Sequence, residues 1–227
     1  SAPDAIEAQS LEGKLVQNII AINNAWNIRN DWDFCIFPDD FPDNRRPTAN
    51  EAQKLIRSEQ YVPLQNKYGG FVYSGGTMAF TAGYWALGHF KPKAIAYIGC
   101  DMIYDGEETH FYGKGTPDPL RKDPTLKNLK AKSARLEAMA ASQNCAIFNF
   151  SKKPKSNLVF RRSSLEKIVE EGHPRSVNTN LLNRVLQPEK QLDYFIEDGK
   201  YWKHLDRLDQ EKIDYLDETW SRVIERN

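Results

Sequence analysis

Short apolar runs separated by polar turns dominate the first two thirds of the chain. Residues 18–23, 34–37, 94–98 and 145–149 are apolar and rich in β-branched or aromatic side chains. Apolar runs of roughly four to eight residues bounded by turn residues are typical of buried strands. We therefore predict strands at these four places, and two shorter strands at 62–64 and 71–73.

Helical patterns lie between these strands. Thr48 with Glu51, and Ser163 with Glu166, have the spacing of a capping box, which predicts helices at 48–57 and 163–171. A third helix is expected at 78–87, after a glycine turn. Residues 126–142 form an amphipathic pattern, which predicts a helix with its small apolar residues inward and its lysines outward.

The alternation of strands and helices predicts an α/β fold, a Rossmann-like, doubly wound and mostly parallel sheet. After about residue 173 the strand patterns stop, and three charged helices with one apolar face are expected at 181–186, 189–208 and 210–225. We therefore divide the chain into a Rossmann-like domain at 1–172 and a helical C-terminal extension at 173–227. The extension is expected to pack on that domain or at a homodimer interface.

Composition narrows the partners of this fold. The 227 residues carry 31 Lys and Arg against 31 Asp and Glu, so the net charge of zero predicts no general attraction to nucleic acid or anionic membrane. No apolar run approaches the roughly 20 residues of a membrane helix, and no secretory segment opens the chain, which predicts a cytoplasmic location. The three cysteines have no metal-binding spacing and are expected to be buried, reduced thiols.

The segment 97–115 holds the strongest candidate for a site. The strand expected at 94–98 is followed by Gly99 and Asp101, and then by a polar loop that carries His110. Ligands of open α/β sheets bind outside the carboxyl ends of the strands. Imidazole titrates near neutral pH, so His110 is a candidate acid or base, with Asp101 beside it. An inert loop histidine is the alternative interpretation.

Two further motifs are expected at strand ends. The turn Ser74, Gly75, Gly76 and Thr77 precedes a helix, where backbone N–H groups and hydroxyls can hold a phosphate. An ordinary N-cap with a tight turn explains this motif equally well. The neighbouring amides of Asn23 and Asn24 can bind a base or ribose, although Asx turns also favour asparagine.

Charged residues offer weaker candidates. Asp39 and Asp40 follow the second strand and can bind a ribose or support a metal, but a solvated turn suits them as well, and we assign no metal site. Arg161 follows an apolar run and is the better anchored cation of a basic region that begins at Lys152. This region can hold a phosphate or carboxylate, or form a solvated loop.

Together these motifs resemble those of sialyltransferase-like glycosyltransferases and the related bacterial motility accessory factors and pterin diphosphokinase-like proteins. The resemblance rests on residues 22–26, 74–77, 98–101 and 109–112, the last of which looks like a His-Tyr-Tyr motif and includes Tyr112. It implies a nucleotide-binding Rossmann-like fold, in which residues 23–24 contact the nucleotide, 74–77 the phosphate, and His110 acts as base. The glycine-rich turn expected upstream in this superfamily is absent.

The resemblance favours a metal-independent glycosyltransferase that uses a nucleotide-activated sugar, such as a CMP-sialic acid-like donor, and a glycan acceptor. No cofactor is expected beyond that substrate. One alternative is a Mg²⁺-dependent diphosphokinase acting on a pterin or nucleotide, with Asp39, Asp40 and Asp101 near the metal. Another is a non-catalytic nucleotide-binding or interaction module whose C-terminal helices dock a partner.

Overall fold

Two small parallel sheets form the framework of the computed structural model, which describes residues 3–11, 16–104 and 122–225. One sheet has the strand order β1-β2-β3 and the other β4-β5-β6, and every pairing is parallel. The strands are β1 (Ile20–Ile22), β2 (Phe34–Ile36), β3 (Lys54–Ile56), β4 (Ala94–Tyr97), β5 (Ala146–Asn149) and β6 (Arg161–Arg162). The chain is therefore a mixed α/β protein, as the sequence predicts.

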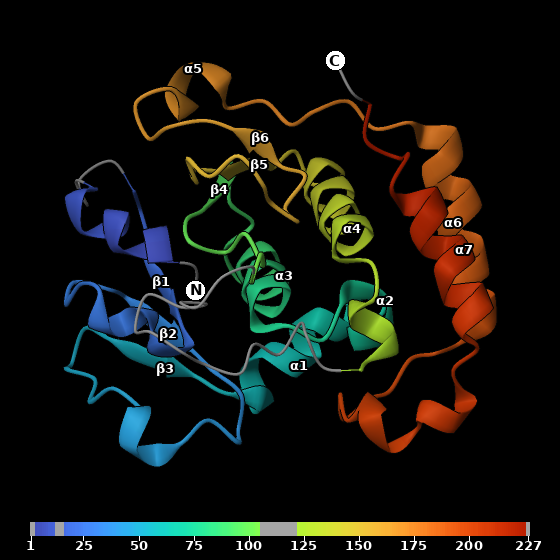
Figure 1. The fold of residues 1–227 in the computed structure, drawn as a ribbon, viewed down its shortest axis with the longest axis horizontal. Coiled ribbons are helices and arrows are strands. Elements are labelled where there is room, and N and C mark those ends of the chain that lie inside the picture. Colours follow the sequence, from blue (N-terminus) through green and yellow to red (C-terminus); the bar gives the residue numbers. More distant parts are fainter. Residues whose placement is uncertain (1–2, 12–15, 105–121, 226–227) are drawn as a thin grey trace.

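Helices surround and separate the two sheets (Figure 1). The α-helices are α1 (Ser58–Asn66), α2 (Phe71–Ser74), α3 (Met78–Phe90), α4 (Leu129–Ala141), α5 (Ile168–Glu171), α6 (Thr179–Leu192) and α7 (Gln210–Trp220). Short 3-10 helices are η1 (Pro3–Ser10), η3 (Asn23–Asn27), η4 (Asp43–Arg45), η6 (Pro124–Leu126), η7 (Tyr201–Lys203) and η8 (Leu205–Arg207). The predicted strands at β1, β2, β4 and β5 and the predicted helices at α3 and α4 are confirmed.

The region 48–73 differs from the prediction. The helix expected at 48–57 is wrong, because Asn50 forms a local turn by accepting a hydrogen bond from the Ala52 N–H (2.9 Å), and β3 follows beside β2. The segment expected to be a strand at 62–64 lies inside α1. Arg57 is the N-cap of this helix, and its backbone N–H donates a hydrogen bond to the Gln60 side chain (2.8 Å). The strand expected at 71–73 is the single turn α2. Apolar runs this short do not distinguish strand from helix.

The C-terminal helices also have other bounds than predicted: α6 extends beyond the helix expected at 181–186, and α7 is shorter than the helix expected at 210–225. The helix expected at 189–208 is wrong, because α6 ends at Leu192 and Asp193 adopts a left-handed conformation (φ 49°). The next segment contains Gly199 (φ 72°) and two 3-10 turns before α7 begins at the Asp209 N-cap. The helix expected at 163–171 is reduced to α5, and strand β6 was not predicted.

Helix α3 is the central element of the fold and lies between the two sheets in Figure 1. Every residue from Met78 to Leu87 is buried, so this helix packs on all sides. At Gly83 a Cβ would come within 2.0 Å of the Tyr97 hydroxyl, and that hydroxyl donates a hydrogen bond to the Ala79 carbonyl (3.1 Å). Glycine thus permits the close approach of β4 to α3.

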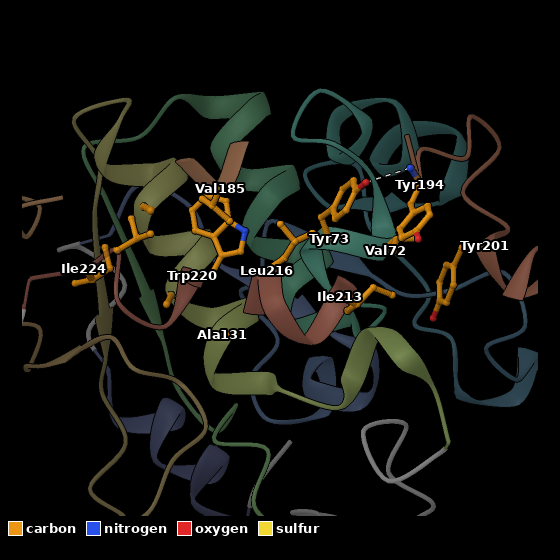
Figure 2. Packing of buried hydrophobic residues seen from close by; sticks show 13 residues of the cluster. Val72, Tyr73, Ala131, Val185, Tyr194, Tyr201, Ile213, Leu216, Trp220 and Ile224 are labelled. Atoms are coloured by element: carbon orange, nitrogen blue, oxygen red, sulfur yellow. Dashed lines mark hydrogen bonds between the residues drawn. The ribbon is translucent and has the colours of Figure 1, made fainter. Parts of the chain in front are cut away.

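The C-terminal helices share a hydrophobic core with α4 and α2. Figure 2 shows Val72, Tyr73, Ala131, Val185, Ile213, Leu216 and Trp220 gathered in this cluster. The Tyr194 backbone N–H donates to the Tyr73 hydroxyl (3.1 Å), which ties the segment after α6 to α2. Across the described residues, no helix has both the length and the apolar character needed to cross a membrane.

The prediction that the lysines of α4 face outward is wrong for Lys132, which is 2% exposed. Its ammonium contacts the Asp217 carboxylate at 2.7 Å, and Arg135, one turn further, pairs with Glu189 at 2.8 Å. Both acids belong to the C-terminal helices. Charged side chains on α4 therefore point into the interior, because α6 and α7 supply counter-charges there.

Candidate nucleotide-binding cavity

A cavity of about 1280 Å³ opens where the two sheets and α3 meet. Its lining comes from the carboxyl ends of β1 and β2, the segment after β4, the first turn of α3, and α1. The C-terminal segment 198–205 closes another side. Carboxyl ends of parallel strands are the usual ligand-binding edge of α/β proteins, so the cavity lies where the sequence predicts a site.

Two asparagines line the cavity at the end of β1. Asn23 adopts a left-handed conformation (φ 52°), and its side-chain Oδ1 is buried without a hydrogen-bond partner in the described part of the chain. Asn24 is 7% exposed and lies beside it on the cavity wall. Buried amide groups normally have hydrogen-bond partners, so the Asn23 Oδ1 is suited to accept a hydrogen bond from a ligand.

The turn from Ser74 to Thr77 joins two helices rather than a strand and a helix. Ser74 is fully buried, and its hydroxyl accepts a hydrogen bond from Gln65 Nε2 (2.5 Å). The Gly76 N–H donates to Thr125 Oγ1 (3.1 Å), and Thr77 Oγ1 caps α3 by accepting from the Ala79 N–H (3.1 Å). Gly76 and Thr77 line the cavity, whereas Ser74 and Gly75 do not.

Gly99 lines the cavity, whereas Asp101, two residues further along the chain, does not. Gly99 (φ 66°) borders the cavity, and a Cβ there would lie 2.4 Å from Ala5 Cβ, so η1 packs directly on it. Asp101 is fully buried, away from the cavity lining. Its Oδ1 accepts a hydrogen bond from Asn149 Nδ2 (3.1 Å) and lies 4.0 Å from Arg162, while Oδ2 has no partner among the described residues. Asp101 therefore fastens the ends of β4, β5 and β6 together.

Arg161 bonds backbone carbonyl groups and does not line the cavity. Its guanidinium donates to the Glu171 carbonyl and to the His173 carbonyl (3.0 Å), and it lies 4.9 Å above the Phe148 ring. These contacts anchor the segment after α5 to β6. The expected anion site at this edge receives no support from Arg161, because Arg161 does not line the cavity and one of its guanidinium nitrogens donates to two backbone carbonyls. His110 and Tyr112 lie outside the described residues.

The two acidic residues that follow β2, Asp39 and Asp40, line the cavity. Asp39 accepts a hydrogen bond from the Ser58 hydroxyl (2.5 Å) and lies 3.6 Å from Arg57, while Asp40 is exposed beside it. Burial raises the pKa of the nearby Tyr61 phenol to about 12, and the charges of Asp39 and Asp40 add to this. No group of three His, Cys, Asp or Glu side chains suited to a metal occurs within residues 3–11, 16–104 and 122–225.

The C-terminal wall of the cavity was not predicted. Tyr201 is 2% exposed, donates its hydroxyl to Asp123 Oδ2 (2.6 Å), and stacks on Phe71 with ring centroids 6.2 Å apart. Trp202 and Leu205 also line the cavity and are exposed. The sequence signal was an adjacent Tyr-Trp pair after a glycine in a polar segment. The helix predicted at 189–208 includes this pair, whereas the structure has the 3-10 helix η7 there.

The structure thus brings Asn23, Asn24, Gly76, Thr77, Gly99, Asp39 and Asp40 to one cavity. Ser74, Gly75, Asp101 and Arg161 support the surrounding backbone. Comparison of the chain with protein-family models, with curated proteins and with solved structures finds no match.

Proposed function

We propose that the cavity binds a nucleotide-activated sugar and that the protein transfers this sugar to an acceptor hydroxyl. The observation that carries the proposal is the buried, unpartnered Oδ1 of Asn23, which lies with the buried Asn24 on the wall of a 1280 Å³ cavity beside the first turn of α3. Amides can bind the donors and acceptors of a base or ribose. The N-terminal turn of α3 adds partial positive charge for a phosphate.

The strand order supports the nucleotide-binding part of the proposal. Edge strands β1 and β4 both pack on α3, and the cavity reaches the ends of both. Taken outward from these edges, the order is β3-β2-β1 on one side and β4-β5-β6 on the other. If β1 and β4 formed one sheet, the order would be that of a Rossmann fold, whose nucleotide binds where the strand order reverses; here the two sheets are separate, and their arrangement supports the proposal by analogy.

The size of the cavity supports a transfer reaction. Typical sites for one small molecule measure roughly 300–1000 Å³, so this cavity has room for a donor and an acceptor together. In the reaction, the bond between the sugar and the phosphate oxygen breaks, and the acceptor oxygen forms the new bond. The nucleotide leaves with the electron pair, and a base takes the acceptor proton. His110 stays our predicted base, and Asp101 acts by positioning the strand ends.

Thermal unfolding with CMP, UDP, GDP and ATP, each with Mg²⁺ or with EDTA, tests nucleotide binding. A nucleotide at 100 times its Kd stabilises the fold by about 2.7 kcal/mol, which raises the Tm of a chain this size by roughly 5–10 °C. We expect one nucleotide to do so in EDTA. Stabilisation only with Mg²⁺ would favour the diphosphokinase alternative, and no stabilisation by any of the four would contradict the proposal.

Variants connect this binding to the amides. Asn24→Ala should weaken nucleotide binding about tenfold, because a ligand then loses a hydrogen bond in a buried site. Asn30→Ala is the matched control, since Asn30 is exposed and lies outside the cavity lining. Equal binding by the two variants would show that Asn24 does not contact the nucleotide.

The homodimer and the cytoplasmic location stay predictions. The apolar face of α7 is largely covered by α4 and α6 within this chain.

A further inference from the structure

One side of the cavity is a row of four aromatic side chains, which we call the aromatic wall. It consists of Tyr61, Phe71, Tyr201 and Trp202, and all four line the cavity. Successive ring centroids lie 6.4, 6.2 and 5.6 Å apart. Tyr61 and Tyr201 are buried, whereas Trp202 is 57% exposed at the end of the row. A large indole ring left open to solvent beside a cavity is a candidate ligand contact.

The backbone that carries Trp202 is firmly seated. Gly199 adopts a left-handed conformation (φ 72°), and a Cβ there would lie 2.9 Å from the Phe71 ring. The Asn66 side-chain amide donates to the Glu197 carbonyl (2.7 Å), and the Lys200 N–H donates to Asp198 Oδ1 (2.9 Å). The Tyr201 hydroxyl bonds Asp123 just before the indole, and the His204 N–H donates to the Tyr201 carbonyl (2.9 Å) just after it. Trp202 is therefore presented by a preorganised turn, which lowers the entropic cost of binding.

The charges beside the aromatic wall are mainly negative. Asp40, Glu59 and Asp198 are exposed and line the cavity here, together with the ammonium groups of Lys122 and Lys200. The charges of Asp40 and Glu59 act on the pKa of Tyr61, so they lie close to the start of the row. Carboxylates only accept hydrogen bonds, so they suit hydroxyl groups and repel phosphate. The phosphate of a donor is better placed at the α3 turn.

We propose that the aromatic wall and these carboxylates form the acceptor subsite and bind a neutral carbohydrate. The C–H face of a pyranose, which carries partial positive charge, packs on the negative face of the Trp202 indole. Asp198 and Glu59 accept hydrogen bonds from the sugar hydroxyls. This inference rests on the proposed function, because it names the acceptor class for the same cavity.

Saturation-transfer difference NMR with three probes tests the subsite. The probes are methyl β-D-galactopyranoside, methyl β-D-glucopyranoside and methyl N-acetyl-β-D-glucosaminide. We expect transfer to the ring C–H protons of at least one probe. Affinity for that probe should be about tenfold weaker in Trp202→Ala and largely kept in Trp202→Phe, since stacking on an aromatic face is worth up to about 1.5 kcal/mol.

Tyr215→Ala is the matched control, because Tyr215 is 59% exposed on α7 and lies outside this cavity. Its saccharide signals should equal those of the unaltered protein. Absence of transfer to all three probes, or equal signals from Trp202→Ala and Tyr215→Ala, would overturn the subsite.

Nucleotide binding separates failure of the subsite from failure of the proposed function. Trp202→Ala should keep the nucleotide-dependent rise in Tm. If that rise disappears while the saccharide signals persist, Trp202 stacks on the nucleobase and the acceptor assignment is wrong. If saccharides bind at Trp202 but no nucleotide stabilises the protein, the subsite stands and the proposed function fails.

Discussion

The three thiols of the chain lie in different environments. Cys35 and Cys145 are buried in strand regions of the two sheets, and burial raises the pKa of each thiol to about 12. Cys100 is half-buried and lines the cavity. The predicted burial is therefore confirmed for Cys35 and Cys145 and is wrong for Cys100.

We therefore expect one fast-reacting thiol in the native protein. At pH 8 a thiol with a pKa of about 12 is thiolate to only about 10⁻⁴, so Cys35 and Cys145 should react slowly, whereas Cys100 is only half-buried and lines the cavity. Alkylation by iodoacetamide, followed by peptide mass spectrometry, should modify Cys100 first by a wide margin. Cys100→Ser should remove the fast phase, and a nucleotide that binds the cavity should slow it. Fast modification of Cys35 would contradict the buried environment.

The sequence pattern of α4 does not predict that two of its charged side chains are buried. Lys132 and Arg135 occupy positions that a hydrophobic pattern assigns to the surface, and only the folded chain brings Asp217 and Glu189 to them. The counter-charges lie more than 50 residues away in sequence. A buried charge requires such a partner, so a pattern read over one helix cannot predict it.

At the scale of elements, Glu189 joins three helices. Its carboxylate on α6 accepts hydrogen bonds from Arg135 of α4 at 2.9 and 2.8 Å and from the Trp220 indole of α7 at 2.6 Å. All three side chains are buried. The position of the C-terminal helices thus depends on one charged network rather than on apolar packing alone.

Glu189→Gln should lower the free energy of unfolding by about 3–5 kcal/mol, because it leaves the Arg135 charge buried without a counter-charge. Urea denaturation measures this loss. Glu218→Gln is the control, since its ion pair with Arg222 is exposed on both sides and should contribute less than about 1 kcal/mol. Similar losses in the two variants would show that the buried network does not hold the helices.

The elements that were predicted correctly have strong local signals. β1, β2, β4 and β5 are runs of consecutive apolar residues, and the Thr77 cap and long apolar run define α3. The elements predicted wrongly depend on distant partners. β3 is a strand because Lys54–Ile56 pairs with Phe34–Ile36. Residues 71–73 form the single helical turn α2, which has a glycine with positive φ at each end.

At the scale of the whole molecule, the cavity is built from segments that span most of the chain. The strand ends near Asn23, Asp39 and Gly99, which the sequence analysis names as candidates, line this cavity. The sequence did not predict the aromatic wall, since that surface exists only after the segment 198–205 packs on α1 and α2. Contacts across more than 120 residues, such as Asn66 with the Glu197 carbonyl, create it.

The same long-range packing predicts one cooperative unit. Helix α4 contributes Ala131 and Ala134 to the core shared with α7, and Leu136 and Ala140 to the core shared with β5. Opening α7 alone would expose the apolar surface of Trp220 and leave Lys132 buried without Asp217, each at a cost of several kcal/mol. The C-terminal helices should therefore not unfold before the sheets.

Native-state hydrogen exchange tests this expectation. The slowest amides of α7, α4 and β5 should share one free energy of opening, within about 0.5 kcal/mol, and one dependence on denaturant. Amides of η1 should exchange at much lower free energy, because the ion pair of Glu7 with Lys152 is solvent-exposed and Ile6 is 48% exposed. A separate opening of α7, with a smaller denaturant dependence than β5, would mean that residues after 173 fold as an independent unit. Trp220 and Asp217 would then contribute little to the stability of the sheets.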